Sequence, residues 1–329
     1  MLPPDFKLIT PITPKENMTM VFEKKTPKWV PNMTIDKGVV FNPADNDRPF
    51  FGKSDYDWFG VHWTNVELVG GQMVTPGTYI LQDPADWVEK LQFPNLDDFD
   101  FTEAGKQAEK TRDPEKFNFY LMQDGLFERW LSLCDPSESL PYLFEEADTA
   151  KEYFRKMADY KIALIEKVLR EFAPIDGIIN SDDWGTQASM FISPSLHRYL
   201  IQPEMKRISS YVHSKGMYID FHSCGKCGDL APDMVDMGAD MWEAQSMNDL
   251  VAIRKALGNK LPIQIGMDNE YLSSPERTED EIRAYIHKFV DTYAGEGGLL
   301  TMTMHPNDDI AAMMAQELYD YSSWYYSRL

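Results

Sequence analysis

The sequence is poor in cysteine, histidine and positive charge. Its 329 residues include 3 cysteines and 6 histidines, and 32 lysines and arginines stand against 53 aspartates and glutamates. Three cysteines, two of them beside a histidine, do not make a disulfide framework, which favours a reducing compartment and predicts a cytoplasmic protein. The net charge of −21 and the lack of a basic cluster argue against binding to nucleic acid or to an anionic membrane.

Long hydrophobic runs and secretion signals are missing as well. No stretch approaches the roughly 20 apolar residues of a membrane span. Residues 1–18 lack the basic start and apolar centre of a signal peptide, so we expect none. Neither a glycine-rich phosphate-binding loop nor a Gly-x-Ser-x-Gly motif occurs, which leaves ATP-dependent, NAD-dependent and serine-hydrolase chemistry without support.

One short segment combines the scarce residue types. Residues 216–228 read GMYIDFHSCGKCG, in which a strand-like run leads into His222 and Cys224. Because alternate side chains of a strand share a face, these two point the same way at its C-terminal end. An imidazole and a thiolate that converge in this way are half of a zinc site. Glycines at 225 and 228 allow the backbone to turn directly afterwards.

Apolar strand-like segments alternate with helical segments about eight times along the chain. The expected strands are residues 28–33, 55–63, 118–122, 175–180, 217–221, 239–242, 263–266 and 299–302. Helical crossovers between short apolar strands predict parallel pairing. This pattern fits one α/β domain over residues 1–329, a (β/α)8 TIM barrel with residues 1–27 as an N-terminal extension. A doubly wound open sheet is the alternative.

The active site of such a barrel lies where the strands end and the loops begin. Polar or aromatic residues stand at these positions after the expected strands: His62, Gln123, Asp182, Asp183, Trp184, His222, Cys224, Glu243, Asp268 and His305. Several are potential metal ligands, and their shared placement is more informative than any one of them.

A catalytic zinc site needs three protein ligands and an open position for substrate. His222 and Cys224 would supply two, and His305, after the last expected strand, is the preferred third. The other candidates for this third ligand are Cys227 and, less favoured, Glu243 and Asp268. Cys227 competes with His305 almost evenly, because it forms a Cys-x-x-Cys pair with Cys224. A buried histidine beside a core cysteine is the alternative without a metal.

The segment NSDDWGTQ, residues 180–187, predicts a polar platform beside an aromatic wall. Asp182 or Asp183 is expected to orient a hydroxyl group or to assist proton transfer. The residues expected to line the substrate pocket are Trp184, Gln187, His62 and Gln123. An aspartate that caps a helix is the alternative for the acidic pair, and ordinary packing is the alternative for the histidine.

Several segments resemble the uroporphyrinogen decarboxylase superfamily, in order along most of the chain. They are Trp29-Val30-Pro31, residues 83–98 (DPADWVEKLQFPNLDD), 180–187 and 193–214, His222-Ser223-Cys224-Gly225, and Gly297-Gly298-Leu299. The resemblance implies a (β/α)8 barrel. Decarboxylases of the superfamily hold the porphyrin carboxylates with arginines and glutamines near the N-terminus, and residues 26–33 contain neither. A polyanionic porphyrin is therefore a poor candidate substrate.

Within the superfamily, the sequence looks like the zinc-dependent methyltransferases that work with corrinoid proteins. In that branch the His-x-Cys pair binds zinc, which implies His222 and Cys224 as ligands. Coenzyme M enzymes have a further cysteine ligand after the last strand, where this sequence has Met304-His305. The chain is more similar to enzymes that demethylate methoxylated aromatics. The resemblance implies transfer of a methyl group from a small aromatic methyl ether to the cobalt of a separate corrinoid protein.

Three other functions remain open at this point. A methylcobamide:thiol methyltransferase would use the same zinc to bind a thiolate, and a decarboxylase would belong to the same superfamily. A small-molecule-binding barrel with a structural zinc is the alternative without catalysis.

Overall fold

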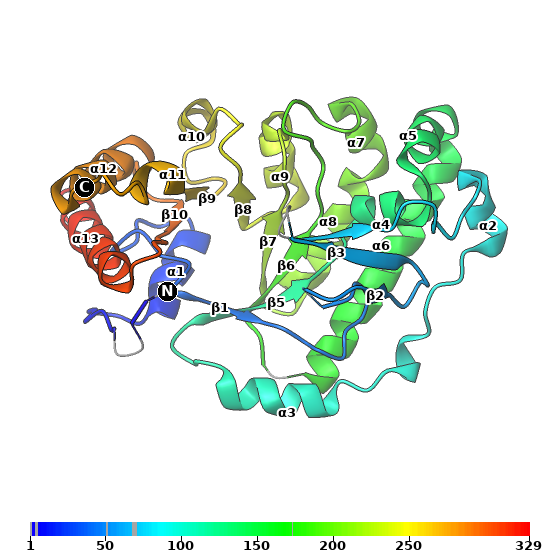
Figure 1. Cartoon of the computed structure of the whole chain (residues 1–329), viewed down its shortest axis with the longest axis horizontal. Coiled ribbons are helices and arrows are strands. Elements are labelled where there is room, and N and C mark those ends of the chain that lie inside the picture. Colours follow the sequence, from blue (N-terminus) through cyan, green and yellow to red (C-terminus); the bar gives the residue numbers. More distant parts are fainter. Residues whose placement is uncertain (1, 4–5, 51, 68–70, 173) are drawn as a thin grey trace.

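The computed structural model describes residues 2–3, 6–50, 52–67, 71–172 and 174–329. Its centre is a curved sheet of parallel strands in the order β1-β5-β6-β7-β8-β9-β10 (Figure 1). These strands are β1 (Lys37–Val40), β5 (Phe117–Met122), β6 (Gly177–Ser181), β7 (Tyr218–His222), β8 (Met241–Ala244), β9 (Ile263–Gly266) and β10 (Leu299–Met302). Parallel pairing throughout this sheet confirms the predicted α/β class with a barrel-like parallel sheet.

One parallel bridge, between Asn32 and Thr301, connects the last strand to the segment just before β1. The main chain of Thr301 accepts a hydrogen bond from Met33 N at 2.8 Å and donates one to Pro31 O at 3.0 Å. The Asn32 side chain also donates to Thr303 Oγ1 at 2.6 Å. These contacts carry the ring of parallel strands from β10 back towards β1.

Two of the eight predicted barrel strands are wrong. Residues 55–63 belong to β2 (Asp55–Tyr56) and β3 (His62–Val66), which pair antiparallel in a separate sheet with β4 (Gly71–Val74). A turn divides this segment, because the Asp57 carboxylate accepts the N–H groups of Phe59 and Val61 and Gly60 adopts a φ of 84°. Residues 28–33 contribute only the bridge at Asn32. A turn then leads into β1, which takes the first place in the barrel.

Helices follow most of the strands and cover the outside of the sheet (Figure 1). The helices are α2 (Trp87–Lys90), α3 (Thr102–Thr111), α4 (Leu126–Leu133), α5 (Pro136–Glu145), α6 (Ala147–Glu171), α7 (Pro194–Leu200), α8 (Gln202–Ser214), α9 (Ala231–Met237), α10 (Leu250–Leu257), α11 (Asn269–Leu272), α12 (Glu279–Tyr293) and α13 (Asp308–Tyr326). Short 3-10 turns span Pro84–Asp86, Leu96–Asp98 and Gly228–Leu230. In the described part of the chain, no helix is both long and apolar enough to cross a membrane.

The inside of the barrel has an apolar layer at the end where the strands begin. Helix α1 (Pro14–Phe22) lies in the expected N-terminal extension and packs against β5. The cluster that it forms with the strands comprises Met18, Val21, Phe22, Met33, Phe117, Phe119, Ile179, Met241 and Leu300. Because side chains alternate along a strand, Asp220, His222 and Glu243 face the same interior further along β7 and β8. A polar layer therefore lies on top of an apolar one.

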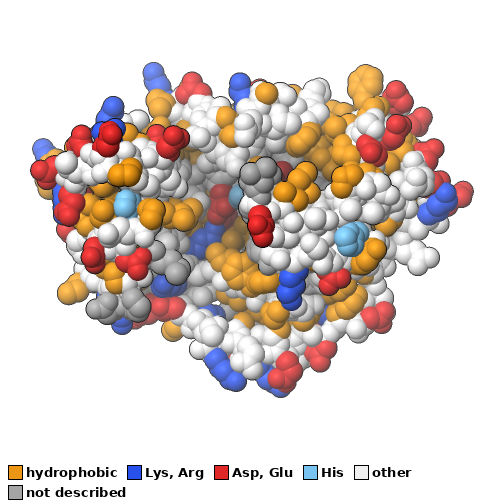
Figure 2. Space-filling view, viewed as in Figure 1, with side chains coloured by type: hydrophobic (Ala, Val, Ile, Leu, Met, Phe, Trp, Pro, Cys, Tyr) orange, Lys and Arg blue, Asp and Glu red, His pale blue; other side chains and the backbone are white. Residues whose placement is uncertain are grey.

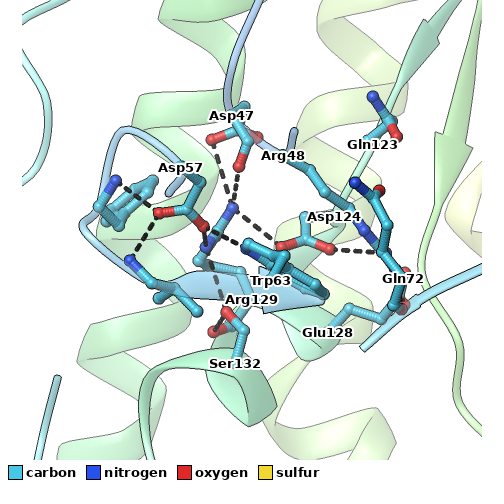
Figure 3. Close-up of polar contacts among 12 residues, drawn as sticks. Asp47, Arg48, Asp57, Trp63, Gln72, Gln123, Asp124, Glu128, Arg129 and Ser132 are labelled. Atoms are coloured by element: carbon cyan, nitrogen blue, oxygen red, sulfur yellow. Dashed lines mark hydrogen bonds and ion pairs between the residues drawn. The ribbon is translucent and has the colours of Figure 1, made fainter. Parts of the chain in front are cut away.

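A buried ionic network fastens the small sheet to the barrel (Figure 3). Arg129 of α4 is fully buried and contacts Asp57 Oδ2 at 2.6 Å and Asp124 Oδ2 at 2.9 Å. It also donates to the main-chain oxygen of Asp47, and Arg48 reaches Asp124 Oδ1 at 3.0 Å. The network joins residues that precede β2, the turn between β2 and β3, and the loop after β5.

We expect Arg129→Met to lower the free energy of unfolding by about 3–5 kcal/mol, because the buried carboxylate of Asp57 loses its cation and Asp124 keeps only Arg48. Chemical denaturation followed by circular dichroism measures this change. Arg155→Met is the matched control, since Arg155 makes only half-exposed ion pairs with Glu152 and Asp159 and should cost less than about 1 kcal/mol. Equal, small losses in the two variants would contradict a stabilising role for the network.

Candidate metal centre

Three side chains with metal-binding atoms converge at the ends of β6 and β7. One ligand atom each from Asp183, His222 and Cys224 lies within 4.8 Å of the other two. His222 Nε2 is 3.5 Å from Cys224 Sγ and 3.9 Å from Asp183 Oδ1. The side chains of His222 and Asp183 keep 33% and 31% of their surface exposed, so the group can be reached from outside.

Strand register brings these residues together. Ser181, the last residue of β6, pairs with His222, the last residue of β7, and His222 pairs with Glu243 of β8. The loops that follow β6 and β7 then pack backbone against backbone. Gly225 has a φ of 87°, and a Cβ at this position would lie 2.1 Å from the main-chain oxygen of Gly185. Only glycine fits here, as the expected turn after the strand requires.

The loop that carries Cys224 is also held from the side of β8. Gln245 Oε1 accepts the N–H of Gly225 at 2.7 Å, and Gln245 Nε2 donates to Cys224 Sγ at 3.2 Å. Asn248 accepts the N–H of Gly228 at 2.7 Å and donates to Gly225 O at 3.0 Å. Sequence reasoning assigned neither amide to the site. The next residue, Asp249, caps α10 by accepting the N–H of Ala252 at 3.0 Å.

Glu243 orients the imidazole of His222. Nδ1 of His222 lies 2.7 Å from Glu243 Oε2, and Glu243 Oε1 lies 2.6 Å from Lys37 Nζ. Burial lowers the pKa of His222, but hydrogen bonds with Cys224 and Glu243 outweigh it and raise this pKa to about 11. Burial likewise opposes ionisation of Glu243, yet Lys37 and His222 hold its pKa below the usual range. With Nδ1 committed to Glu243, Nε2 is the nitrogen that faces Cys224 and Asp183.

The donor set fits a divalent metal ion of the zinc type. Bonds of about 2.0 Å to nitrogen and 2.3 Å to sulfur at a tetrahedral angle place the two atoms about 3.5 Å apart, as His222 Nε2 and Cys224 Sγ are. When a metal ion takes the place of the proton on His222 Nε2, the imidazole is neutral, and a carboxylate and a thiolate then balance the charge of a divalent cation. Three protein ligands leave a fourth position for a substrate.

Asp182 is next to Asp183 in sequence but serves a different purpose. Its carboxylate is fully buried and accepts the N–H groups of residues 126–128, the first turn of α4, at 2.8–3.2 Å. It also accepts from Trp184 Nε1 at 2.9 Å. Burial raises the pKa of Asp182 to about 7, and these donors act against that rise. Asp182 thus caps α4 from another part of the chain and makes no contact with the metal-binding atoms.

Trp184 lies in the core, with 1% of its surface exposed. Its ring packs edge-on against His197 at 4.7 Å and against Phe221 at 6.0 Å between centroids. The Trp184 ring, which the sequence predicts as a wall of the substrate pocket, is instead in contact with these core residues and hydrogen-bonded to Asp182.

The remaining candidate third ligands lie outside the group. His305 is hydrogen-bonded to the main chain of Asn307 at 3.0 Å. Cys227 is buried, with Sγ 3.6 Å from Ser223 Oγ. Asp268 is exposed and caps α11. In place of the preferred His305, the structure brings Asp183 to His222 and Cys224, because the close packing of the loops after β6 and β7 decides which side chain is near.

The other expected pocket residues are spread over the molecule. His62 begins β3 and lies 2.7 Å from Thr75 Oγ1 in the small sheet. Gln123 follows β5 beside the ionic network, and its Oε1 is buried without a hydrogen-bond partner. Gln187 is exposed and lines a cleft of about 800 Å³ together with Gln245 and Asp268.

The two neighbouring aspartates make a matched pair for mutation. We expect Asp182→Ala to lower the free energy of unfolding by about 2–4 kcal/mol, since buried N–H groups of α4 lose a charged acceptor. Asp183→Ala should leave the melting temperature nearly unchanged, because that side chain is half-exposed and accepts one protein N–H, from Cys224. Thermal unfolding of both variants tests the difference. A larger loss in Asp183→Ala would show that these roles are assigned the wrong way round.

Comparison with known proteins shows which family the chain resembles. A sequence model of the uroporphyrinogen decarboxylase family matches residues 130–316, more than half of the chain. The chain belongs to the uroporphyrinogen decarboxylase family. The matched residues include Asp183, His222 and Cys224, whereas Lys37 lies before them. No curated protein sequence matches the chain.

One of the solved structures that match the chain shares its fold. A methyltransferase from Methanosarcina mazei superposes with a TM-score of 0.61 at 15% identity, covering 94% of this chain and 99% of that one. At this identity the likeness shows a shared fold. A Xanthomonas albilineans dihydropteroate synthase covers 44% of this chain and 52% of its own at 11% identity, with a TM-score of 0.28. A Prevotella bryantii endo-β-mannanase/endo-β-glucanase covers 87% and 48% at 11% identity, with a TM-score of 0.38.

Proposed function

We propose that this protein is a zinc-dependent methyltransferase, which moves a methyl group from a small methoxylated aromatic compound to the cobalt of a corrinoid protein. The observation that carries the proposal is the Asp183–His222–Cys224 group, with nitrogen and sulfur at tetrahedral spacing. Three ligands with an open fourth position are typical of catalytic zinc. Membership of the family and the shared fold with a methyltransferase add support.

The chain's own residues would bind the metal and set its charge. Asp183, His222 and Cys224 would hold zinc, which as a Lewis acid makes an ether oxygen a better leaving group. Glu243 keeps the His222 ring oriented through its Nδ1–H. Gln245 donates a hydrogen bond to the sulfur of Cys224 at 3.2 Å, which holds this side chain beside His222.

A partner protein needs access to such a site. Figure 2 shows a hollow near the middle of this face, where acidic, basic and histidine side chains gather at its base above hydrophobic ones. The partial exposure of His222 and Asp183 fits an approach from outside. We propose that the corrinoid protein docks over the ends of the strands. The three cysteines carry no disulfide bond, which suits a cytoplasmic enzyme.

The decarboxylase reaction after which the family is named fits this chain less well. A porphyrin with several carboxylates needs cations around it, but the metal-binding group offers a carboxylate and a thiolate. Two nearby cations are already paired, Lys37 with Asp220 and Glu243, and Arg48 with Asp124 and Glu128. Electrostatic repulsion would therefore oppose a polyanionic substrate.

Metal content is the first test of the proposal. We expect about one zinc per purified chain, lost in Cys224→Ala, because a site cannot hold zinc tightly on the two remaining ligands. Cys227→Ala is the matched control, since this cysteine is three residues away and outside the donor group. Elemental analysis after dialysis measures both. Retention of zinc in Cys224→Ala, or its loss in Cys227→Ala alone, would overturn the ligand set.

Methyl transfer is the second test. The unmodified protein, incubated with a reduced corrinoid protein and a series of methoxylated aromatics, should convert the cobalt to its methylated form, followed by visible absorption. His222→Ala should slow this reaction by more than about 100-fold, because the metal loses a direct ligand. Transfer only from methylated corrinoid to a thiol would favour the thiol methyltransferase. If the zinc-loaded protein catalyses neither of these two reactions, the proposed function is contradicted.

A further inference from the structure

Lys37 lies beneath the metal centre and is almost completely enclosed. Its Nζ is 2.8 Å from Asp220 Oδ2 and 2.6 Å from Glu243 Oε1, and its side chain is 4% exposed. The aromatic ring of Phe119 closes another side of the enclosure, with its centroid 5.2 Å from Nζ. Enclosing an ammonium group is unfavourable unless partners compensate, so its position is closely defined by these contacts.

The contact spans the interior of the barrel. Lys37 begins β1, while Asp220 and Glu243 belong to β7 and β8, three and four places away in the order of the strands. No strand-to-strand hydrogen bond connects β1 with either of them among the pairings of the described residues. The Lys37 side chain therefore connects β1 with β7 and β8, which the hydrogen bonds of the sheet do not join directly.

We propose that Lys37 is a positioning residue, which holds Glu243 in the orientation that accepts the Nδ1–H of His222 and thereby sets the metal affinity of the site. This inference rests on the metal centre proposed above. The chain of contacts runs from Lys37 Nζ through the two oxygens of Glu243 to His222 Nδ1, with steps of 2.6 and 2.7 Å. The opposite edge of the imidazole then faces Cys224 and Asp183.

Both oxygens of Glu243 are used in this arrangement, one by Lys37 and one by His222. Without the lysine, the Glu243 carboxylate would lose the cation that fixes its Oε1 and could rotate about its side-chain bonds. It would also stand beside the buried carboxyl group of Asp220 without the ammonium group that now contacts both, and repulsion would push the two groups apart. A carboxylate that accepts a hydrogen bond from a metal-binding histidine raises the metal affinity by orienting the ring. Disorder of the Glu243 carboxylate would therefore disorder the His222 ring and lower the metal affinity of the site.

The experiment compares zinc affinity in Lys37→Met, Lys37→Arg and the unmodified protein, by competition with a chelator. Lys37→Met should lower the affinity about 10-fold, and Lys37→Arg should restore most of it, because a guanidinium can still bind the carboxylate. Lys167→Met is the matched control, because Lys167 is also buried and lies 2.7 Å from a carboxylate oxygen, that of Glu171. Lys167 belongs to the last turns of α6, which precede the start of β6, whereas the candidate metal ligands lie where the strands end. Its loss should leave zinc affinity unchanged.

A second readout separates positioning from general stability. In zinc-loaded protein with ¹⁵N-labelled histidine, the Nδ1–H of His222 should give a slowly exchanging resonance, assigned by its loss in His222→Gln. We expect this proton to exchange faster with water in Lys37→Met and to remain protected in Lys37→Arg and Lys167→Met. A structural role alone would not move this signal in folded protein.

A further pair of variants covers the case in which Lys37→Met does not fold. Lys37→Met/Asp220→Asn removes one buried charge of each sign, and its comparison with Asp220→Asn isolates the lysine. An unchanged zinc affinity and an unchanged His222 resonance in the folded variant would overturn the inference about Lys37 and leave the proposed function intact. Absence of zinc binding by the unmodified protein would overturn both.

Discussion

The parallel pairing of β6, β7 and β8 is the constraint on which the site depends. Parallel strands end at the same edge of a sheet, and here the register sets Ser181 beside His222 and His222 beside Glu243. The position of each site residue then follows from the number of residues between it and the end of its strand. Cys224 is two residues beyond the strand end of β7, and Asp183 is two beyond that of β6. A shift of the register by one residue would turn these side chains to the outside of the barrel.

The neighbouring residues Asp182 and Asp183 have different surroundings, one buried beneath α4 and one in the candidate metal centre. Asp182 turns inward, where the N–H groups at the start of α4 offer the hydrogen bonds that a buried carboxylate needs. Asp183 turns to the other side and accepts the N–H of Cys224 at 2.6 Å. The capped helix and the metal-binding group are thus connected through two consecutive residues. Burial determines which of the two can take part in a reaction, because only Asp183 keeps an exposed surface.

Much of the fold was predictable because six barrel strands are short apolar runs between helical segments, a local pattern. The failure at residues 55–63 has a local cause too, since those residues are apolar but divided by the turn at Asp57 and Gly60. At the site, His222 and Cys224 were predictable from alternation along one strand. His305 was chosen as the third ligand because it also follows a strand, and the sequence alone contains no information about which strand ends are close together.

By itself, the sequence determined the barrel class, the strand that carries His222 and Cys224, and the glycine turn that follows it, because these depend on side-chain periodicity over a few residues. Only the tertiary structure decided that Asp183 joins them, that Asp182 caps a helix 54–56 residues away, and that Lys37 reaches Glu243 across 206 residues of chain. Those contacts follow from strand order and loop packing, and the chain acquires them only when the sheet curves and brings distant segments together.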